Sequence, residues 1–401
     1  MPDASRKRYL VDTHRTRDPL ETLAAVREHL PGMGITRVAN LTGLDRIGLP
    51  TVMVTRPNSR SVAVSLGKGL SIEAAEASGV MEAIETWHAE RIRLPVRLGK
   101  YSDLCAEEAV IDVERLPKVT GAAFDPNVPM LWIQGGDLPA GTTVWVPYQM
   151  VDTDYTNMPM GTRNVFPRTT NGLASGNNRI EATCHAICEL IERDATTVWH
   201  FGGTTSRVNP NTVTDTRCID ALERFANAGI DVGIWETTTD TGVPSFHSTI
   251  CESGDRPSHI GIGDGCHPDR TIALLRALTE AAQTRLTYIS GARDDLEPEE
   301  FTSTALEGKW RYIREQIEQS APDLDFADGP TRVSSSFEDD LDWLLSSLTS
   351  SGINQVAAVD LSRQNMDVSV VRAIIPGLEA PHDDPDFIPG NRALRAAGKA
   401  T

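Results

Sequence analysis

Carboxylates recur at helical spacing in three separate segments of the sequence. In the first segment, at about 71–92, Ser78, Glu82 and Glu85 fall at i, i+4 and i+7 and therefore share one face of a helix. Their neighbours on this face are three alanines and a methionine, so both carboxylates should be partly buried. Buried like charges are costly unless a cation compensates them, and a hard divalent metal ion would do so.

An ordinary interpretation of this first helix is also open. Two glutamates taken alone are more often solvated residues of a helix surface, and we expect the exposed side at Glu76, Thr86 and Glu90. The preceding loop at 67–69 (GKG) would let the backbone approach a ligand closely and offers the ammonium group of Lys68. The loop lacks the upstream glycine of GxxxxGK[ST], so it is not a Walker A phosphate-binding loop.

The second segment, at about 178–200, repeats the pattern. Glu181, Cys188 and Glu192 share a stripe with His185, and Glu189 lies at its edge. The residues before this helix, at 175–178 (SGNN), are typical of a turn and could cap it. Free amides at a helix N-terminus also suit an anionic ligand.

Soft ligands in the second segment raise the alternative of a zinc site. Cys184, His185 and Cys188 have suitable side chains, but Cys184 and His185 point about 100° apart on a helix. No second pair of ligands lies nearby in the sequence, so we favour structural packing for these cysteines. Cys266 beside His267 could similarly suggest a nucleophile, but no orienting partner is identifiable.

The third segment, at about 269–290, places Arg276, Glu280, Gln283 and Thr287 on one stripe. Taken alone, this is an Arg–Glu pair on a solvated helix, worth a few tenths of a kcal/mol. Taken with the other two helices, it completes a set of carboxylate-rich faces that needs cations. Magnesium ions between these carboxylates and a polyphosphate would compensate the negative charge of both. Lys68, Arg193 and Arg276 could then contact phosphate. The carboxylates of this predicted site are Glu82, Glu85, Glu181, Glu189, Glu192 and Glu280.

Strands and helices must position these faces. The segments 51–57, 61–67, 143–151 and 353–362 are rich in β-branched residues and are predicted as strands. Helices are predicted at the three segments above and at 303–319 and 337–350. This irregular alternation indicates a mixed α/β (α+β) architecture and not a regular doubly wound sheet.

The composition excludes some classes of partner. A formal net charge of −18 argues against nucleic acid, because an acidic surface repels phosphate. No stretch reaches the roughly 20 apolar residues that a membrane span needs, and the N-terminus lacks the apolar region of a signal peptide. The six cysteines form no CxxC pair. We therefore expect a cytoplasmic protein with reduced thiols.

Four segments of this sequence resemble the successive ATP-site motifs of the YcaO family. They read SLGKGLS, ASGVMEAIE, NGLASGNNRIEATCHAICELIERDA and ALTEAAQTR, and the stretches 35–69 and 289–295 also fit the family pattern. The resemblance implies magnesium ligation and catalysis through Glu82, Glu85, Glu181 and Glu192. It further implies a nucleotide site lined by Glu82 and Glu181 together with Ser78, Asn177, Glu189, Arg193, Glu280 and Gln283.

Other features are implied less directly by the same resemblance. Many relatives place a basic residue near the N-terminus against the phosphates, for which Arg15 is the candidate here, with Thr22 nearby. Ala174 stands where some relatives have serine, which puts one hydroxyl contact in doubt. The family fold implies mixed sheets flanked by helices, an ATP site between helices, and often a homodimer. The expected organisation is an N-terminal segment at 1–60, a catalytic domain at 61–385 and a tail at 386–401.

The chemistry implied by the resemblance is ATP- and Mg²⁺-dependent O-phosphorylation of a backbone amide in a ribosomally made peptide or protein. Cyclodehydratase members often end in a proline-rich PxPxP-like tail, whereas this chain ends GLEAPHDDPDFIPGNRALRAAGKAT. This ending, with GLDRIGLP and PGLE, looks like members that work beside a TfuA-type partner and install thioamides from an external sulfur donor. We therefore expect a separate TfuA-like or leader-binding partner protein.

Other reactions and classes of function remain open. Within the family, the alternatives are azoline formation by cyclodehydration and amidine formation. From other classes, they are an ATP-dependent small-molecule ligase or kinase, and a non-catalytic scaffold that binds nucleotide.

Overall fold

Every helix expected from hydrophobic periodicity is present, and most begin at a side chain that caps the first turn. Asn178, Asp269, Thr302 and Ser336 each accept a hydrogen bond from a backbone N–H of the helix that follows them. The predicted strands are also present, as β2, β3, β6 and β11. The confirmed helices are α2 (Ile72–Ala89), α4 (Arg179–Gly202), α6 (Arg270–Ser290), α7 (Ser303–Gln319) and α8 (Phe337–Ser350).

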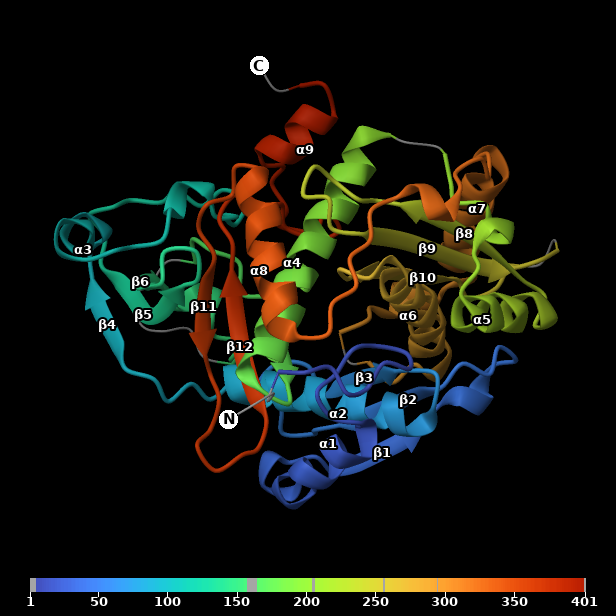
Figure 1. The fold of residues 1–401 in the computed structure, drawn as a ribbon, viewed down its shortest axis with the longest axis horizontal. Coiled ribbons are helices and arrows are strands. Elements are labelled where there is room, and N and C mark those ends of the chain that lie inside the picture. The colour runs from blue at the N-terminus through green and yellow to red at the C-terminus, as the bar shows by residue number, and fades with distance from the viewer. Residues whose placement is uncertain (1–4, 157–163, 204–205, 255–256, 294, 400–401) are drawn as a thin grey trace. The chain divides into compact units, whose positions relative to one another are not determined.

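The computed structural model describes residues 5–156, 164–203, 206–254, 257–293 and 295–399 (Figure 1). Asp294 of the motif at 289–295 and residues 400–401 of the expected tail lie outside these ranges. The chain packs as two units. Unit 1 comprises Met1–Arg6, Ile84–Gly203 and Ser334–Thr401, and unit 2 comprises Lys7–Ala83 and Thr204–Val333. The functional ranges expected from the sequence, 1–60, 61–385 and 386–401, do not coincide with these units and stay a prediction.

Unit 2 contains two antiparallel sheets of three strands, with orders β1–β2–β3 and β10–β9–β8. Helix α6 contacts strands of both sheets, and its apolar side chains share one core cluster with Leu49, Phe225 and Phe246. The elements not yet given are β1 (Arg37–Asn40), β2 (Thr51–Thr55), β3 (Val64–Lys68), β8 (Ile230–Glu236), β9 (Ser245–Glu252), β10 (Gly261–Cys266), α1 (Pro19–Val26) and α5 (Thr216–Asn227).

Helix α6 lies unusually close to strand β10 because every second residue of that strand is glycine. A Cβ atom on any of the three glycines would overlap a carbonyl oxygen of α6. Four helical residues rise about 6 Å and two strand residues about 6.6 Å, so each glycine meets the next turn of the helix. The facing pairs are Gly261 with Ala281, Gly263 with Ala277, and Gly265 with Ala273.

Unit 1 contains a six-stranded antiparallel sheet of order β4–β5–β11–β12–β7, in which β6 also pairs with β5. Helix α4 packs on β7 and β12 and contacts α8 and α9. Figure 1 shows α4 in green, α8 in orange, and β12 and α9 in red. The remaining elements are β4 (Val96–Gly99), β5 (Met130–Asp137), β6 (Thr142–Pro147), β7 (Leu173–Gly176), β11 (Ala357–Asp360), β12 (Ser369–Ile374), α3 (Tyr101–Glu107) and α9 (Asn391–Ala396).

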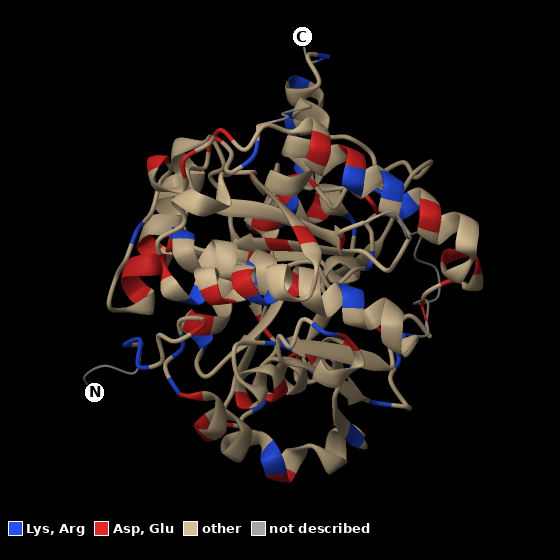
Figure 2. Ribbon diagram, turned by 90° about the vertical axis from the view of Figure 1, so that its right-hand side faces the viewer, with Lys and Arg blue, Asp and Glu red and all other residues tan. Residues whose placement is uncertain are grey.

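The charged side chains are mostly interspersed. Helix α7 carries two ion pairs at i, i+4, between Arg311 and Glu307 and between Arg314 and Glu318. Figure 2 shows acidic and basic residues mixed along the elements that face the viewer. Within the described ranges, none of the helices combines the length and the apolar character required to span a bilayer.

Candidate active site

Unit 2 brings three of the predicted residues together. Lys68, the last residue of β3, forms a half-buried ion pair with Glu280 of α6, from a segment far away in the sequence. Glu82 of α2 is close enough to both side chains for their charges to act on its carboxyl group. The predicted meeting of the first and third carboxylate stripes is thus observed within this unit.

Burial governs the charge of Glu82. It raises the pKa of the Glu82 carboxyl from 4.5 to about 7, and the charge of Glu280 adds to this rise. The Lys68 ammonium, the Arg293 guanidinium and the backbone N–H of Leu66 act in the opposite direction. Arg293 lies in the motif at 289–295, but no role was expected for it from the sequence. A divalent cation at this position would favour the ionised carboxylate.

The other polar residues of the α6 stripe lie as expected from the period of the helix. Arg276 and Gln283 are half-buried beside Glu280, and the hydroxyl of the buried Thr287 donates to the backbone oxygen of Gln283. The side-chain oxygen Oε1 of Gln283 is buried, and no donor reaches it from the described part of the chain. A ligand donor at this point would satisfy it.

The glycines on either side of Lys68 pack against helix α2. A Cβ on Gly67 would overlap the carbonyl oxygen of Ala75 and the backbone nitrogen of Gly79, both in α2. A Cβ on Gly69 would similarly crowd the Cβ of Ala74. These glycines let β3 lie against α2, and the approach of a ligand to this loop stays a prediction.

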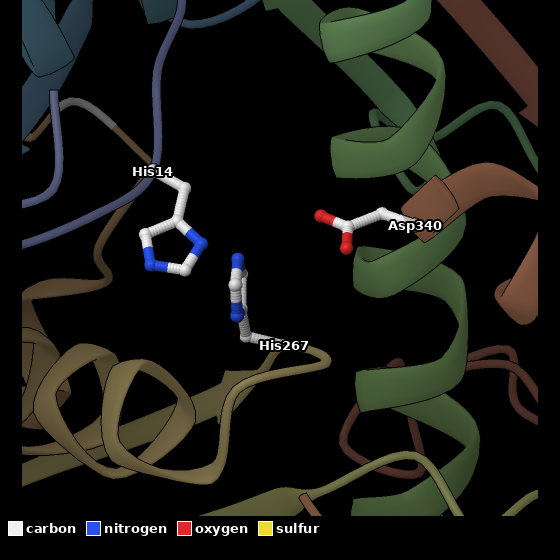
Figure 3. Close-up of side chains that lie close together, drawn as sticks. All are labelled: His14, His267 and Asp340. Atoms are coloured by element: carbon white, nitrogen blue, oxygen red, sulfur yellow. The ribbon is translucent and has the colours of Figure 1, made fainter. Parts of the chain in front are cut away.

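Two buried histidines form a feature of unit 2 that the sequence did not reveal. The rings of His14 and His267 meet edge to face with centroids 4.8 Å apart, as Figure 3 shows. Burial lowers the pKa of His14 to about 3, and it lowers that of His267 strongly. Lys7 and Arg15 add to both effects, so the two rings are neutral at physiological pH and lie among permanent cations.

His267 and the preceding residue, Cys266, are both held in the interior of unit 2. The Nδ1 atom of His267 accepts a hydrogen bond from the backbone N–H of Asp269, 2.9 Å away, which places the ring proton on Nε2. Cys266 is fully buried in β10. His267 is therefore held by a backbone contact and Cys266 by burial in the strand.

The N-terminal candidates lie in unit 2 as well. Arg15 is half-buried, donates through Nη1 to the backbone oxygen of His14, and lies near His267. Thr22 is buried in α1, where its hydroxyl donates to the backbone oxygen of Asp18. Whether either residue contacts a nucleotide stays a prediction.

Unit 1 holds the other predicted carboxylates. Both the backbone N–H and the hydroxyl of Ser175 donate to Oε1 of Glu85, at 2.8 and 2.6 Å. The backbone and side-chain nitrogens of Asn177 donate to Oε1 of Glu181, at 3.2 and 3.1 Å. These donors orient the carboxylates, as the supporting groups of a metal site do.

Two further predicted carboxylates, Glu189 and Glu192, lie on the following turns of α4. Glu192 is 4% exposed and lies 3.6 Å from the guanidinium of Arg193. Glu189 is half-buried and accepts a hydrogen bond from the backbone N–H of Gly172 at 3.2 Å. The predicted inward stripe of α4 is therefore observed. Ala174, where a serine was expected from some relatives, is fully buried in β7 opposite Val371.

Helix α2 differs from the prediction on its other side. Ser78 is half-buried like Glu82 and Glu85, but Thr86 and Glu90, which were expected to be exposed, are buried. Glu90 forms an ion pair with Arg91 that leaves its own side chain inaccessible. The prediction was wrong because it assumed one solvated face, whereas this helix is enclosed on several sides.

The cysteines of α4 lie in the protein interior. Cys184 and Cys188 are buried, and the thiol of Cys184 donates to the backbone oxygen of Phe337. Across the described ranges, no group of three clustered metal-ligating side chains includes Cys184, His185 or Cys188. Packing explains these residues.

Each unit of this mixed α+β protein thus holds buried or half-buried carboxylates, on α2 and α6 in unit 2 and on α2 and α4 in unit 1. The sequence model of YcaO, described as a cyclodehydratase that binds ATP and Mg²⁺, matches residues 66–379. The chain therefore belongs to the YcaO family of ATP-dependent peptide-modifying enzymes.

Relatives support this assignment over most of the chain. A protein from the tfuA 3′ region of Rhizobium leguminosarum bv. trifolii is 35% identical over 380 residues, covering 90% of this chain and 87% of the relative. A protein of Methanothermobacter thermautotrophicus is 36% identical over 389 residues, covering 94% and 98%.

Solved structures show the same fold. YcaO from Methanopyrus kandleri, bound with AMPPCP and Mg²⁺, superposes with a TM-score of 0.76 at 22% identity, covering 96% of this chain and 98% of that one. A heterocyclase in complex with substrate and cofactor gives a TM-score of 0.78 at 20% identity. This chain covers 54% of the heterocyclase, and 95% of this chain is matched. The mixed α/β fold expected from the sequence is confirmed.

Proposed function

We propose that this enzyme phosphorylates the oxygen of a peptide backbone amide and replaces that oxygen with sulfur, giving a thioamide. In the proposed reaction, hydrosulfide adds to the amide carbonyl, the resulting oxyanion takes the γ-phosphoryl group of ATP, and phosphate then leaves with the original oxygen. The products are a thioamide, ADP and phosphate. The similarity to a protein from a tfuA region supports sulfur as the nucleophile and a TfuA-like protein as the partner.

The observation that carries the proposal is the set of oxygen donors. The acidic side chains Glu82, Glu85, Glu181 and Glu192 are half-buried or buried, and none of the four is a soft ligand. Such donors fit Mg²⁺, which prefers carboxylate and phosphate oxygens. Bound magnesium would neutralise the charge that develops on a transferred phosphoryl group.

The protein's own groups have distinct roles in this proposal. The donors from Ser175 and Asn177 hold Glu85 and Glu181 in place, so the carboxylates need no rearrangement when a metal ion binds. Lys68 and Arg293 favour ionisation of Glu82, which must lose its proton before it can ligate. Gln283 contributes a side-chain oxygen for a ligand donor, such as a nucleotide hydroxyl or amino group.

The test is substitution of one carboxylate with a matched control. Glu192→Gln should abolish ADP release that depends on peptide, while the melting temperature stays near the wild-type value. Glu76→Gln, the same change at a half-buried position of α2 outside the proposed site, should retain activity. Wild-type turnover in the Glu192→Gln enzyme would contradict the proposed metal ligation.

The product distinguishes thioamide formation from its alternatives. The enzyme, a TfuA-like partner, ATP, sulfide and a candidate peptide would be incubated together and the peptide weighed by mass spectrometry. Exchange of one oxygen for sulfur supports thioamidation. Loss of one water indicates azoline formation by cyclodehydration. ATP hydrolysis that peptide does not stimulate would favour a small-molecule ligase or kinase.

A further inference from the structure

Arg372 is a fully buried arginine in the middle of the unit 1 sheet. It lies on β12, between β11 and β7, opposite Val359 on one side and Leu173 on the other. Only 1% of its surface is exposed. The other residues on its side of the strand, Val370 and Ile374, are apolar and buried, as expected for a central strand.

Two of the three guanidinium nitrogens of Arg372 have no acceptor in the described part of the protein. Its Nε and Nη1 atoms are buried and make no hydrogen bond. Other buried arginines differ: Arg270 is paired with Glu236, and Arg285 with Glu252. Leaving a buried charged donor without an acceptor is costly, so such groups are retained where a ligand completes them.

The register of the sheet places Arg372 beside a predicted metal ligand. Val370 lies opposite Ser175 and Arg372 opposite Leu173, so the side chains of Arg372 and Ser175 leave the same face of the sheet. Diagonal neighbours of this kind are about 7 Å apart, a distance that an arginine side chain can bridge. Ser175 is the residue that donates twice to Glu85.

Two other polar groups lie near the guanidinium. Burial lowers the pKa of Arg372 to about 10, while the Glu189 carboxylate and Tyr155 oppose this decrease. The arginine therefore remains charged at neutral pH. Glu189 accepts the N–H of Gly172, the residue before the one opposite Arg372. Tyr155, the other of these two groups, is 45% exposed.

We propose that Arg372 binds an anionic oxygen of the reacting molecules, on the sheet face that carries Ser175 and Glu85. This inference rests on the proposed function. Two reactants there offer such an oxygen: a phosphoryl group of the nucleotide, and the carbonyl oxygen of the peptide amide as it becomes negative. Both would accept hydrogen bonds from a guanidinium, which binds oxyanions in a planar and directional way.

The first measurement separates ligand binding from a structural role. Arg372→Met removes a buried charge whose Nε and Nη1 atoms have no hydrogen-bond acceptor in the described part of the protein, so its melting temperature should equal or exceed that of the wild type. Arg270→Met is the matched control, because Arg270 is also buried but is paired with Glu236, and this variant should melt at a lower temperature. If Arg372→Met is destabilised as much as Arg270→Met, the arginine is structural and the proposal fails.

The second measurement identifies the ligand. Affinity for Mg-AMPPCP is measured by calorimetry, and ADP release at saturating ATP is measured with a synthetic pool of random dodecapeptides. A tenfold to hundredfold weaker affinity in Arg372→Met, roughly the loss of one charge-assisted hydrogen bond, assigns the oxygen to the nucleotide. Unchanged affinity with a similar loss of peptide-stimulated ADP release assigns it to the peptide. If both values stay within about threefold of the wild type, the proposal fails.

Two additions keep the test decisive. Arg372→Lys keeps the charge but loses the planar fork, and should show the same loss to a smaller degree even if Arg372→Met does not fold. If the wild-type enzyme neither binds Mg-AMPPCP nor releases ADP, the proposed function is wrong, and inorganic phosphate becomes the probe. Phosphate should then raise the melting temperature of the wild type and not that of Arg372→Met. An equal rise in both would overturn the inference.

Discussion

Glu82→Gln should make the metal-free protein more stable at neutral pH, although it removes a residue of the proposed active site. The wild-type carboxyl has a pKa of about 7 in the folded protein and 4.5 as its ordinary value. Between these values the unfolded chain has lost the proton and the folded protein has kept it. The free energy of unfolding of the wild type therefore decreases as the pH rises from 4.5 to 7.

The size of the effect follows from the same two values. At about 1.4 kcal/mol for each pH unit, a difference from 4.5 to about 7 corresponds to roughly 3 kcal/mol. Glutamine has nearly the same shape and no proton to lose. The stability of Glu82→Gln minus that of the wild type should therefore rise by up to about 3 kcal/mol between pH 4.5 and 7 and then level off.

Urea unfolding at several pH values, in EDTA, measures this difference. Subtracting the two curves cancels the other titrating groups, which both proteins share. Glu73→Gln is a useful control of opposite sign, because a hydrogen bond at its own backbone N–H and another from Ser71 lower the pKa of the exposed Glu73. That variant should lose stability, relative to the wild type, as the pH rises above the folded pKa of Glu73.

Added Mg²⁺ gives the complementary result. The metal ion should stabilise the wild type increasingly as the pH rises through 7, and should stabilise Glu82→Gln less at every pH. A difference curve without pH dependence, or a Glu82→Gln protein that is less stable than the wild type at pH 8, would refute the burial of Glu82 on which this reasoning depends.

Three further predictions concern other parts of the chain. Cys184→Ser and Cys188→Ser should keep peptide-dependent ADP release, and loss of activity together with a metal ion detected by mass spectrometry would revive the zinc alternative. Asp194→Ala should cost about 3–5 kcal/mol in urea unfolding, because fully buried Asp194 holds Arg392 and the backbone of Glu379. An unchanged midpoint would contradict that arrangement. Gly263→Ala should lower the melting temperature by forcing α6 away from β10, and a stabilised variant would contradict their close contact.

The sequence predicted the helices of the candidate site well because their signals are local. The 3.6-residue period and the capping residues Asn178 and Asp269 lie within the segments that they organise. The positions of Glu181 and Glu192 on an inward face followed directly from this period. Lys68 and Glu280 were expected in the same site, but their ion pair was not predicted, because no local signal specifies a particular ion pair.

Contacts between distant segments were not predictable in the same way. Arg372 occupies a strand, β12, that was not predicted, and its burial depends on β7 and β11 on either side. The pairing of His14 with His267 joins the N-terminal segment to the residue after β10. Thr86 and Glu90 were misjudged because helical periodicity shows which residues share a face but not how many faces are covered.

The glycines of β10 limit how this enzyme can change. The backbone of α6 already touches the strand at each of these positions. Even a methyl group there would overlap the helix, so substitutions on β10 cannot shift α6 by a small amount. Glu280 and Gln283 lie on α6, so their positions depend on the absence of side chains at these glycines. Differences in substrate preference among enzymes built in this way should therefore arise in segments that do not rest on this strand.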